Sequence, residues 1–278
     1  MCGEKLDRRQ PQHREMRIAR AKNQAQTKMN TSGAHPRPWR KRPGSWDSLR
    51  QYLLFPSSNP YGFPDLLPQP PGLDIPPSLF PHLYCKEIKT TRPVLIYFYT
   101  EDFRFEVVWN EPHKGLKAVC RPRKVWGAVA PDFSLYAHYP KIMNQWQWYR
   151  EMWVARLWQE RGVTVIPTVS TPIGVYLHSN GDREIFEWSF PTIPRGQILS
   201  LHTWYYNQSE RVKWMEGYKI MLDMLEPRRL LWFGHIYDEA TDNVPKMYFE
   251  VGHWDREQRQ RVVAGNIATE GAIEGKEM

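Results

Sequence analysis

The chain has 278 residues, of which 24% are charged, 41% hydrophobic and 14% aromatic, and its formal net charge is +8. A chain of this length forms one large domain or two small ones and can bury a sizeable core. It has no apolar run of the roughly 18–20 residues that a membrane helix needs, and no apolar secretory signal at the start. We therefore expect a cytoplasmic protein that does not bind membranes.

The three cysteines are widely spaced and odd in number, so they form neither a disulfide framework nor a metal-binding pair. They are Cys2, Cys85 and Cys120. This use of cysteine is typical of a reducing cytosol.

The positive charge is concentrated at the amino terminus. Residues 1–42 contain 12 Lys/Arg and 3 Asp/Glu, a net charge of +9, whereas the rest of the chain has a net charge of −1. Residues 1–45 have almost no apolar periodicity, which predicts a disordered basic arm. If translation starts at Met29, the net charge of the whole chain falls to +3.

The basic arm suggests contacts with the phosphates of DNA or RNA, without readout of the bases. The residues that we expect to make such contacts are Arg37, Arg40, Lys41 and Arg42. A solvated extension without a ligand is an equally good interpretation of the same composition.

A proline-rich segment follows the arm over residues 46–90. Nine prolines lie within residues 55–81, interleaved with leucine, phenylalanine and tyrosine. This mixture is too apolar for a free linker, so we expect an extended strap that packs on the body of the protein.

Regular elements begin near residue 90. The apolar run 93–99 predicts a buried strand, and Thr100 is placed to cap a short helix over 101–109. Residues 125–130 predict the next strand. Pro140 suits the first turn of a long helix that ends near Gly162. Its expected apolar face consists of Ile142, Trp146, Tyr149, Trp153 and Leu157.

Three further strands are expected at 163–169, 184–190 and 197–203. Asn207 and Glu210 have the spacing of a capping box, which predicts the start of another helix. Pro227 ends that helix, and residues 229–233 form a strand that ends at Gly234. The apolar face expected for the helix consists of Val212, Met215, Tyr218, Leu222 and Leu225.

The alternation of strands and helices predicts an α/β domain over residues 91–255, followed by a charged tail over 256–278. A strand, a long helix and a strand in succession form a βαβ unit with parallel strands. We expect a barrel-like or partial (β/α) barrel with mainly parallel strands.

Ligands of parallel α/β folds bind at the carboxyl ends of the strands, and this rule selects the candidate site. Asp132 directly follows a strand and is the expected acid, base or nucleophile, with Ser134 and Tyr136 beside it; a turn-capping role for Asp132 is the alternative. Other strand ends supply candidate substrate-binding residues, and Arg150 on the long helix could bind a phosphate. The strand-end candidates are Ser170, Thr171, Thr203 and His235.

No cofactor is indicated by the sequence. It contains no Walker A loop, no GxGxxG after a strand, no GxSxG and no HExxH. We expect no metal site, because no pair among Asp132, His138, His202 and His235 has the spacing of metal ligands.

Six blocks in order resemble the domain-of-unknown-function family 4417, which is found in bacterial, plasmid and phage genomes. The resemblance covers about residues 90–237 and implies a protein of mobile elements. The chain departs from the family pattern at Thr171, where relatives often have tryptophan. It also departs in an apparent insertion through Gly181. The blocks are EDFRFEVVWNEP (101–112), PDFSLY (131–136), WQERG (158–162), VIPTVS (165–170), FEWSF (186–190) and GYKIMLDMLEPRRLLWFG (217–234).

A more distant likeness is to barrel enzymes of the tRNA-guanine transglycosylase type, and it implies that Asp132 recognises a base or acts as a nucleophile. The zinc-binding cysteines of those enzymes have no counterpart in this chain.

Three interpretations of function remain open. The first is an enzyme that acts on or binds nucleotides or nucleic acid through the strand ends around Asp132. The second is a non-catalytic module that the basic arm recruits to nucleic acid, with a protein partner for the body. The third is an interaction protein whose exposed aromatic residues form a subunit interface.

Overall fold

We analysed a computed structural model, which describes residues 54–76, 78–81, 93–120, 125–136, 139–169, 188–203 and 207–249. The chain divides into two compact units, Met1–Leu54 and Phe55–Met278. The expected basic arm, the insertion near Gly181 and the charged tail lie outside the described residues.

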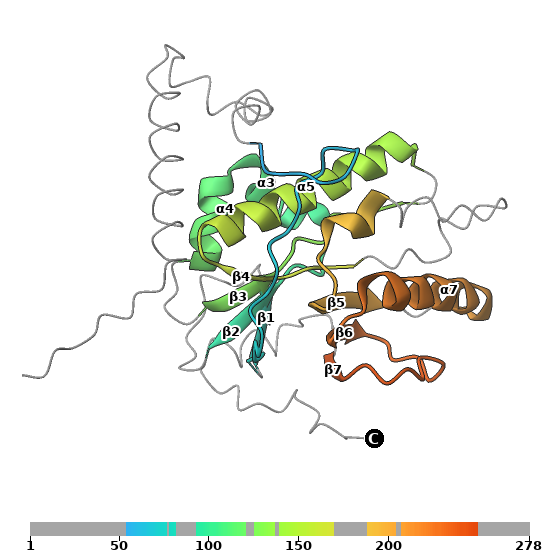
Figure 1. Cartoon of the computed structure of the whole chain (residues 1–278). Helices are drawn as coiled ribbons and strands as arrows, with labels where there is room; N and C mark the ends of the chain where they lie inside the picture. Colours follow the sequence, from blue (N-terminus) through green and yellow to red (C-terminus); the bar gives the residue numbers. More distant parts are fainter. Residues whose placement is uncertain are drawn as a thin grey trace, which may run out of the picture. The chain divides into compact units, whose positions relative to one another are not determined.

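Seven described strands form two parallel sheets (Figure 1). The first sheet has the order β1-β2-β3-β4 and the second the order β5-β6-β7, so that neighbours in space follow the order of the chain. A single parallel bridge, Thr168 to Ser200, joins the two sheets. The expected α/β fold with parallel strands is confirmed, and the described strands do not close into a barrel. The strands are β1 (Ser78–Pro81), β2 (Val94–Tyr97), β3 (Val125–Val129), β4 (Thr164–Ile166), β5 (Ile198–Thr203), β6 (Arg229–Gly234) and β7 (Lys246–Phe249).

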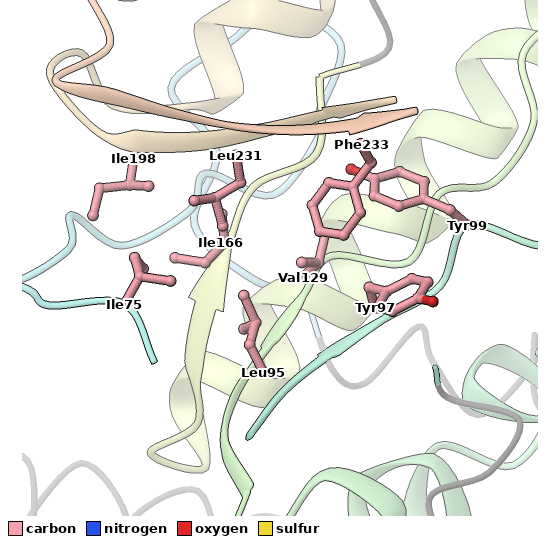
Figure 2. Packing of buried hydrophobic residues seen from close by; sticks show 9 residues of the cluster. All are labelled: Ile75, Leu95, Tyr97, Tyr99, Val129, Ile166, Ile198, Leu231 and Phe233. Atoms are coloured by element: carbon pink, nitrogen blue, oxygen red, sulfur yellow. The ribbon is translucent and has the colours of Figure 1, made fainter. Parts of the chain in front are cut away.

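Alternate side chains of the strands enter one apolar core that both sheets share (Figure 2). Leu95 and Tyr97 of β2 point into it from the first sheet, and Leu231 and Phe233 of β6 point into it from the second. The intervening residues are also buried, because helices cover the opposite faces of the sheets. The centres of β2 and β6 are therefore apolar on both faces, which is why the sequence predicts these two strands.

Helix α5 (Lys141–Glu160) is the long helix of the expected βαβ unit, and it packs outside the first sheet with Trp158 5.4 Å from the ring of Phe98. The expected carboxyl end is confirmed: Gly162 has φ 79°, and its N–H donates to the Gln159 carbonyl (2.9 Å). The N–H of Val163 donates to the Trp158 carbonyl at 3.0 Å, which completes a Schellman motif.

The apolar face expected for α5 is wrong in its first half. Ile142 is 70% exposed and Trp146 is 45% exposed, whereas Trp148 and Met152 are buried. All residues from Arg150 to Trp158 are buried. The second half of the helix lies between the sheet and the proline-rich segment, so no single apolar face exists there.

The prediction of a single helix over 101–109 is also wrong. The region contains a 3-10 turn, η3 (Asp102–Arg104), followed by α3 (Val107–Asn110) and α4 (Pro112–Cys120), the last of which was not predicted. The Thr100 hydroxyl donates to the Glu101 carboxylate at 2.8 Å, and no side chain caps η3.

The second half of the domain follows the prediction more closely. Helix α7 (Gln208–Leu225) begins with the expected capping box: Asn207 Oδ1 accepts from the Glu210 N–H (3.1 Å), and Glu210 Oε2 accepts from the Asn207 N–H (2.9 Å). The helix covers β6 through Trp214, whose ring lies 5.3 Å from that of Trp232. Its expected apolar face is wrong at Val212, which is 58% exposed.

Two further differences concern strands. The strand expected at 184–190 is wrong over its described part, because residues 188–192 form helical turns that end in η4 (Phe190–Thr192). Strands β1 and β7 were not predicted. Strand β1 contains Pro81 and lies at the edge of its sheet, where a missing N–H is tolerated.

The proline-rich segment is tied to the body by Gln69, which is buried. Its Nε2 donates to the carbonyls of Ile198 (2.9 Å) and Val165 (3.3 Å), and its Oε1 accepts from the Ile198 N–H (2.8 Å). One amide side chain therefore bonds to both β4 and β5, the adjacent strands at which the two sheets meet. No described helix is both long and apolar enough to cross a membrane.

Candidate functional site

The parallel strands direct their carboxyl ends to one edge, and polar residues of both sheets meet there. The Tyr99 hydroxyl, just after β2, lies 2.5 Å from the Ser200 hydroxyl of β5. The Tyr99 ring stacks on His202 with the ring centres 4.7 Å apart. Thr168, just after β4, donates its hydroxyl to the Ala130 carbonyl at 3.0 Å. At this edge the contacts between the two sheets are therefore polar, although they are buried.

Burial determines the protonation states of Tyr99 and His202. Burial, and after it the charge of Asp132, raises the pKa of the Tyr99 phenol well above its usual value, although the Ser200 hydrogen bond opposes the shift. Burial lowers the pKa of His202 to about 4. Tyr99 and His202 are therefore both uncharged at neutral pH.

Asp132 lies in the loop after β3, between the buried residues Pro131 and Phe133, and is itself half-buried. Its charge acts on Tyr99 and on Glu151 of α5. The charge of Asp132, at its predicted strand-end position, therefore acts on ionisable groups of two other elements.

Glu151 is fully buried, and neither of its carboxyl oxygens has a hydrogen bond. Burial, followed by the charges of Asp132 and Asp102, raises the pKa of Glu151 well above its usual value. This residue was not predicted from the sequence. The signal available in the sequence was its position on α5, three residues after the buried Trp148 and seven before the buried Trp158.

The loop that carries Asp132 is fixed by a second carboxylate, Asp102 of η3. Asp102 accepts from the Ser134 hydroxyl (2.8 Å) and from the Ser134 N–H (3.1 Å). Burial raises the pKa of Asp102, and these hydrogen bonds partly offset that effect. Asn144 of α5 holds the next part of the loop, because its amide accepts from the Tyr136 N–H (3.0 Å) and donates to the Tyr136 carbonyl (2.8 Å).

Other predicted residues are engaged within the protein. Arg150 donates to Glu106 at 2.7 Å, and its guanidinium lies 4.0 Å above the centre of the Phe133 ring. The Thr203 hydroxyl donates to the Phe233 carbonyl at 3.2 Å and accepts from the Trp232 indole at 3.0 Å.

The remaining predicted residues divide between exposed and undescribed positions. His235 and Tyr136 are exposed near the same strand ends. Six predicted residues lie outside the described part of the chain: Ser170, Thr171, Arg37, Arg40, Lys41 and Arg42.

No group of three His, Cys, Asp or Glu residues is placed to hold a metal ion within the described segments. A surface hollow of about 320 Å³ lies elsewhere, between η4 and the end of α7, and its lining includes Phe190, Ile193 and Leu225. None of the predicted site residues lines this hollow.

Two phage proteins are similar to the chain over most of its length. The chain is 30% identical over 230 residues to the "Gene 1 protein" of Mycobacterium phage D29, which covers 80% of this chain and 78% of the relative. It is 28% identical over 235 residues to the "Gene 1 protein" of Mycobacterium phage L5, which covers 82% of this chain and 93% of the relative. No solved structure matches the chain.

The family model that describes the domain of unknown function DUF4417 matches residues 55–251. The match confirms the resemblance found in the sequence and extends it beyond residues 90–237, because it includes the proline-rich segment and β7. The chain belongs to the DUF4417 family, which has relatives in phages.

Proposed function

We propose that the chain is an enzyme that acts on a nucleotide or a nucleic acid at the strand ends around Asp132. One observation carries this proposal: Asp132, a partly exposed carboxylate directly after β3, has a charge that raises the pKa of two buried groups, Tyr99 and Glu151. Ionisable groups with strongly shifted pKa values cluster at functional sites. The edge concerned is also the one at which parallel α/β folds bind ligands.

We further propose that the two sheets are parts of one partial (β/α) barrel. All neighbouring strands are parallel and follow the order of the chain. The bridge from Thr168 to Ser200 continues this order from β4 to β5, and both sheets line one core. This arrangement supports a common rim for the residues after β2, β3, β4, β5 and β6.

In this proposal Asp132 is the acid, base or nucleophile, since it directly follows β3 and is partly exposed. Ser134 and Tyr136 follow it in the same loop and position the substrate, and Asp102 fixes the loop through Ser134. The substrate class is supported by the phage origin of the relatives and by the basic charge of residues 1–42.

The full chain should be incubated with nucleosides, nucleotides and short DNA and RNA oligonucleotides, with products identified by mass spectrometry. We expect a product from at least one substrate, and a rate lowered about 100-fold or more in Asp132→Asn. Asp223→Asn, on the exposed side of α7, is the matched control. Equal rates for Asp132→Asn and the unaltered chain would contradict the proposed role.

The charge distribution favours a second candidate function, a non-catalytic module that its arm recruits to nucleic acid. This candidate predicts weak binding without sequence preference that falls steeply with salt. Replacing Arg37, Arg40, Lys41 and Arg42 with glutamate in the full chain should abolish binding in a filter assay. Binding that is insensitive to salt, or that survives these replacements, would count against it.

A further inference from the structure

Five large apolar side chains are exposed around the loop that carries Asp132. Phe103 of η3 is the most exposed of them, at 73%, and the others belong to the loop itself and to the first half of α5. Single exposed apolar residues are common on proteins, but a contiguous group of them marks a binding site. We call these five residues the aromatic surface: Phe103, Tyr136, Ile142, Met143 and Trp146.

Hydrogen bonds hold η3, the loop and α5 together at one place. Asp102 immediately precedes Phe103 and accepts from the Ser134 hydroxyl at 2.8 Å. Gln147 immediately follows Trp146 in α5. Its amide donates to Asp102 at 3.4 Å and to the Ser134 carbonyl at 3.3 Å. Because their neighbours in sequence are bonded to each other, Phe103 and Trp146 lie on one part of the protein surface.

The other three members of the aromatic surface adjoin the same place. Tyr136 is held through both of its backbone groups by the Asn144 amide of α5. Met143 and Ile142 precede Trp146 by three and four residues, a spacing that makes them its neighbours on the helix. The five exposed side chains therefore surround the start of α5 and the loop after β3.

The Trp146 ring is held in a fixed orientation by two other rings. It lies nearly parallel to the Tyr149 ring, with 9° between the planes and 5.8 Å between the centres. It also packs against Trp109 edge to face, with the centres 5.3 Å apart. Trp146 is nevertheless exposed, so it presents a rigid aromatic ring to a ligand.

The charged groups of the aromatic surface suit a phosphate. The guanidinium of Arg104 lies over the Phe103 ring, 5.3 Å from its centre. Among the described residues only its Nε is hydrogen-bonded, to the Glu101 carboxylate at 2.6 Å, so both terminal nitrogens can bond to a phosphate. Lys141 adds a second exposed cation next to Ile142. Three acidic side chains of this region are bonded to donors of the protein: Glu101 to Arg104, Asp102 to Ser134 and Glu106 to Arg150.

We propose that the aromatic surface binds a single-stranded nucleic acid, whose bases stack on its rings while Arg104 bonds to a phosphate. This inference rests on the proposed function and names the substrate class as a single strand of DNA or RNA, rather than a free nucleotide or a duplex. Aromatic side chains stack on unpaired bases of any sequence, whereas a duplex buries those faces between its base pairs. Asp132 lies four residues before Tyr136, so a strand on this surface brings a nucleotide to the proposed site.

The test measures binding by the fluorescence anisotropy of labelled single strands of about 12 nucleotides, one of DNA and one of RNA, and of a DNA duplex of the same length. We expect both single strands to bind about tenfold more tightly than the duplex. The tighter of the two identifies the sugar that the surface prefers. To remove the contribution of the basic arm, the protein is the full chain with four replacements: Arg37→Glu, Arg40→Glu, Lys41→Glu and Arg42→Glu.

Phe103→Ala and Trp146→Ala, each in this background, should weaken single-strand binding about tenfold and leave duplex binding unchanged. Phe103 is the safer position, because its exposed side chain contributes little to the core. Phe103→Trp keeps a flat ring and should retain binding. Val212→Ala, at an exposed apolar residue of α7, is the control. The melting temperature of each variant shows whether it is folded.

Other outcomes contradict either this inference or the proposed function. Equal binding of single strands and duplex, or unchanged single-strand binding in Phe103→Ala, shows that the inference is wrong, and the proposed function stands if Asp132→Asn still lowers the rate. If Trp146→Ala abolishes self-association in light scattering but keeps single-strand binding, the surface binds a second copy of the chain and the inference is wrong. If the unaltered chain neither binds nor converts any nucleotide or oligonucleotide, the proposed function is wrong and this inference with it.

Discussion

The hydroxyl groups of Tyr99 and Ser200 hydrogen-bond at 2.5 Å between two sheets that share only one backbone bridge among the described residues. Both residues are buried. The contact fixes the end of β2 against β5, next to the residues that we propose as the active site.

Removing one hydroxyl of this pair should destabilise the protein. We expect Tyr99→Phe to lower the free energy of unfolding by about 1–3 kcal/mol, because it leaves the buried Ser200 hydroxyl without a partner. Urea denaturation measures the change. Tyr136→Phe, at an exposed tyrosine, is the control and should change the stability little. Equal stability of the two variants would show that the Tyr99 hydrogen bond contributes nothing.

Glu151 should make stability fall as the pH rises. Its pKa in the folded protein lies above the usual value, so the folded state keeps a proton that the unfolded chain releases above about pH 4.3. The contribution is complete at low pH and is lost as the pH rises toward the folded pKa. Melting temperatures of Glu151→Gln and the unaltered chain should diverge as the pH rises above about 4.3, in favour of the variant. The control is Glu216→Gln on the exposed side of α7, and a parallel course for Glu151→Gln would refute the burial of an unpartnered carboxyl.

His202 should make the stability of the protein fall as the pH falls. Burial lowers its pKa from 6.5 to about 4, so the unfolded chain binds a proton at a higher pH than the folded protein does. Stability is therefore lost as the pH falls from 6.5 to 4, by about 3 kcal/mol in full. His202→Gln should remove this acid-side loss in denaturation curves recorded at pH 4, 5 and 7. His235→Gln at an exposed strand end serves for comparison, and an unchanged acid-side loss in His202→Gln would contradict the assignment.

The parts of the fold that could be predicted are those in which one local signal decides the structure. β2 and the centre of β6 are apolar because both faces are covered, and the capping box at Asn207 fixes the start of α7. The face of α5 could not be predicted, because its second half is buried on all sides by segments distant in sequence. β1 was missed because its proline is tolerated only at a sheet edge, which the sequence does not reveal.

The same limit applies to the candidate site. Asp132 could be selected because it directly follows a strand, and that rule needs no tertiary contact. Tyr99 and Ser200 are 101 residues apart, and only the parallel order of the sheets brings them together. Glu151 was missed because its importance lies in the absence of a partner, and pairing is a property of the fold.

The Gln69 side chain should be essential for joining the sheets. In Gln69→Leu the Ile198 N–H and the Ile198 and Val165 carbonyls lose their bond to this amide. Because these groups are buried, we expect a loss of about 3 kcal/mol or more in the free energy of unfolding. Gln208→Leu, at the exposed start of α7, is the control for the change in side chain. A loss below that of the control would mean that other contacts hold the proline-rich segment in place.

Gly234 ends β6 at the proposed rim, and two independent constraints require glycine there. Its φ is 96°, and an added Cβ would lie well inside van der Waals contact with the Thr203 carbonyl oxygen. Gly196 is the matched control, since its φ of 72° imposes the same kind of strain but nothing lies within 4 Å of an added Cβ. We expect Gly196→Ala to cost about 1 kcal/mol and Gly234→Ala more than about 3 kcal/mol, because only the latter forces β5 and β6 apart. Thermal denaturation of both variants separates the two contributions, and equal costs would show that the close approach of β5 and β6 relaxes without penalty.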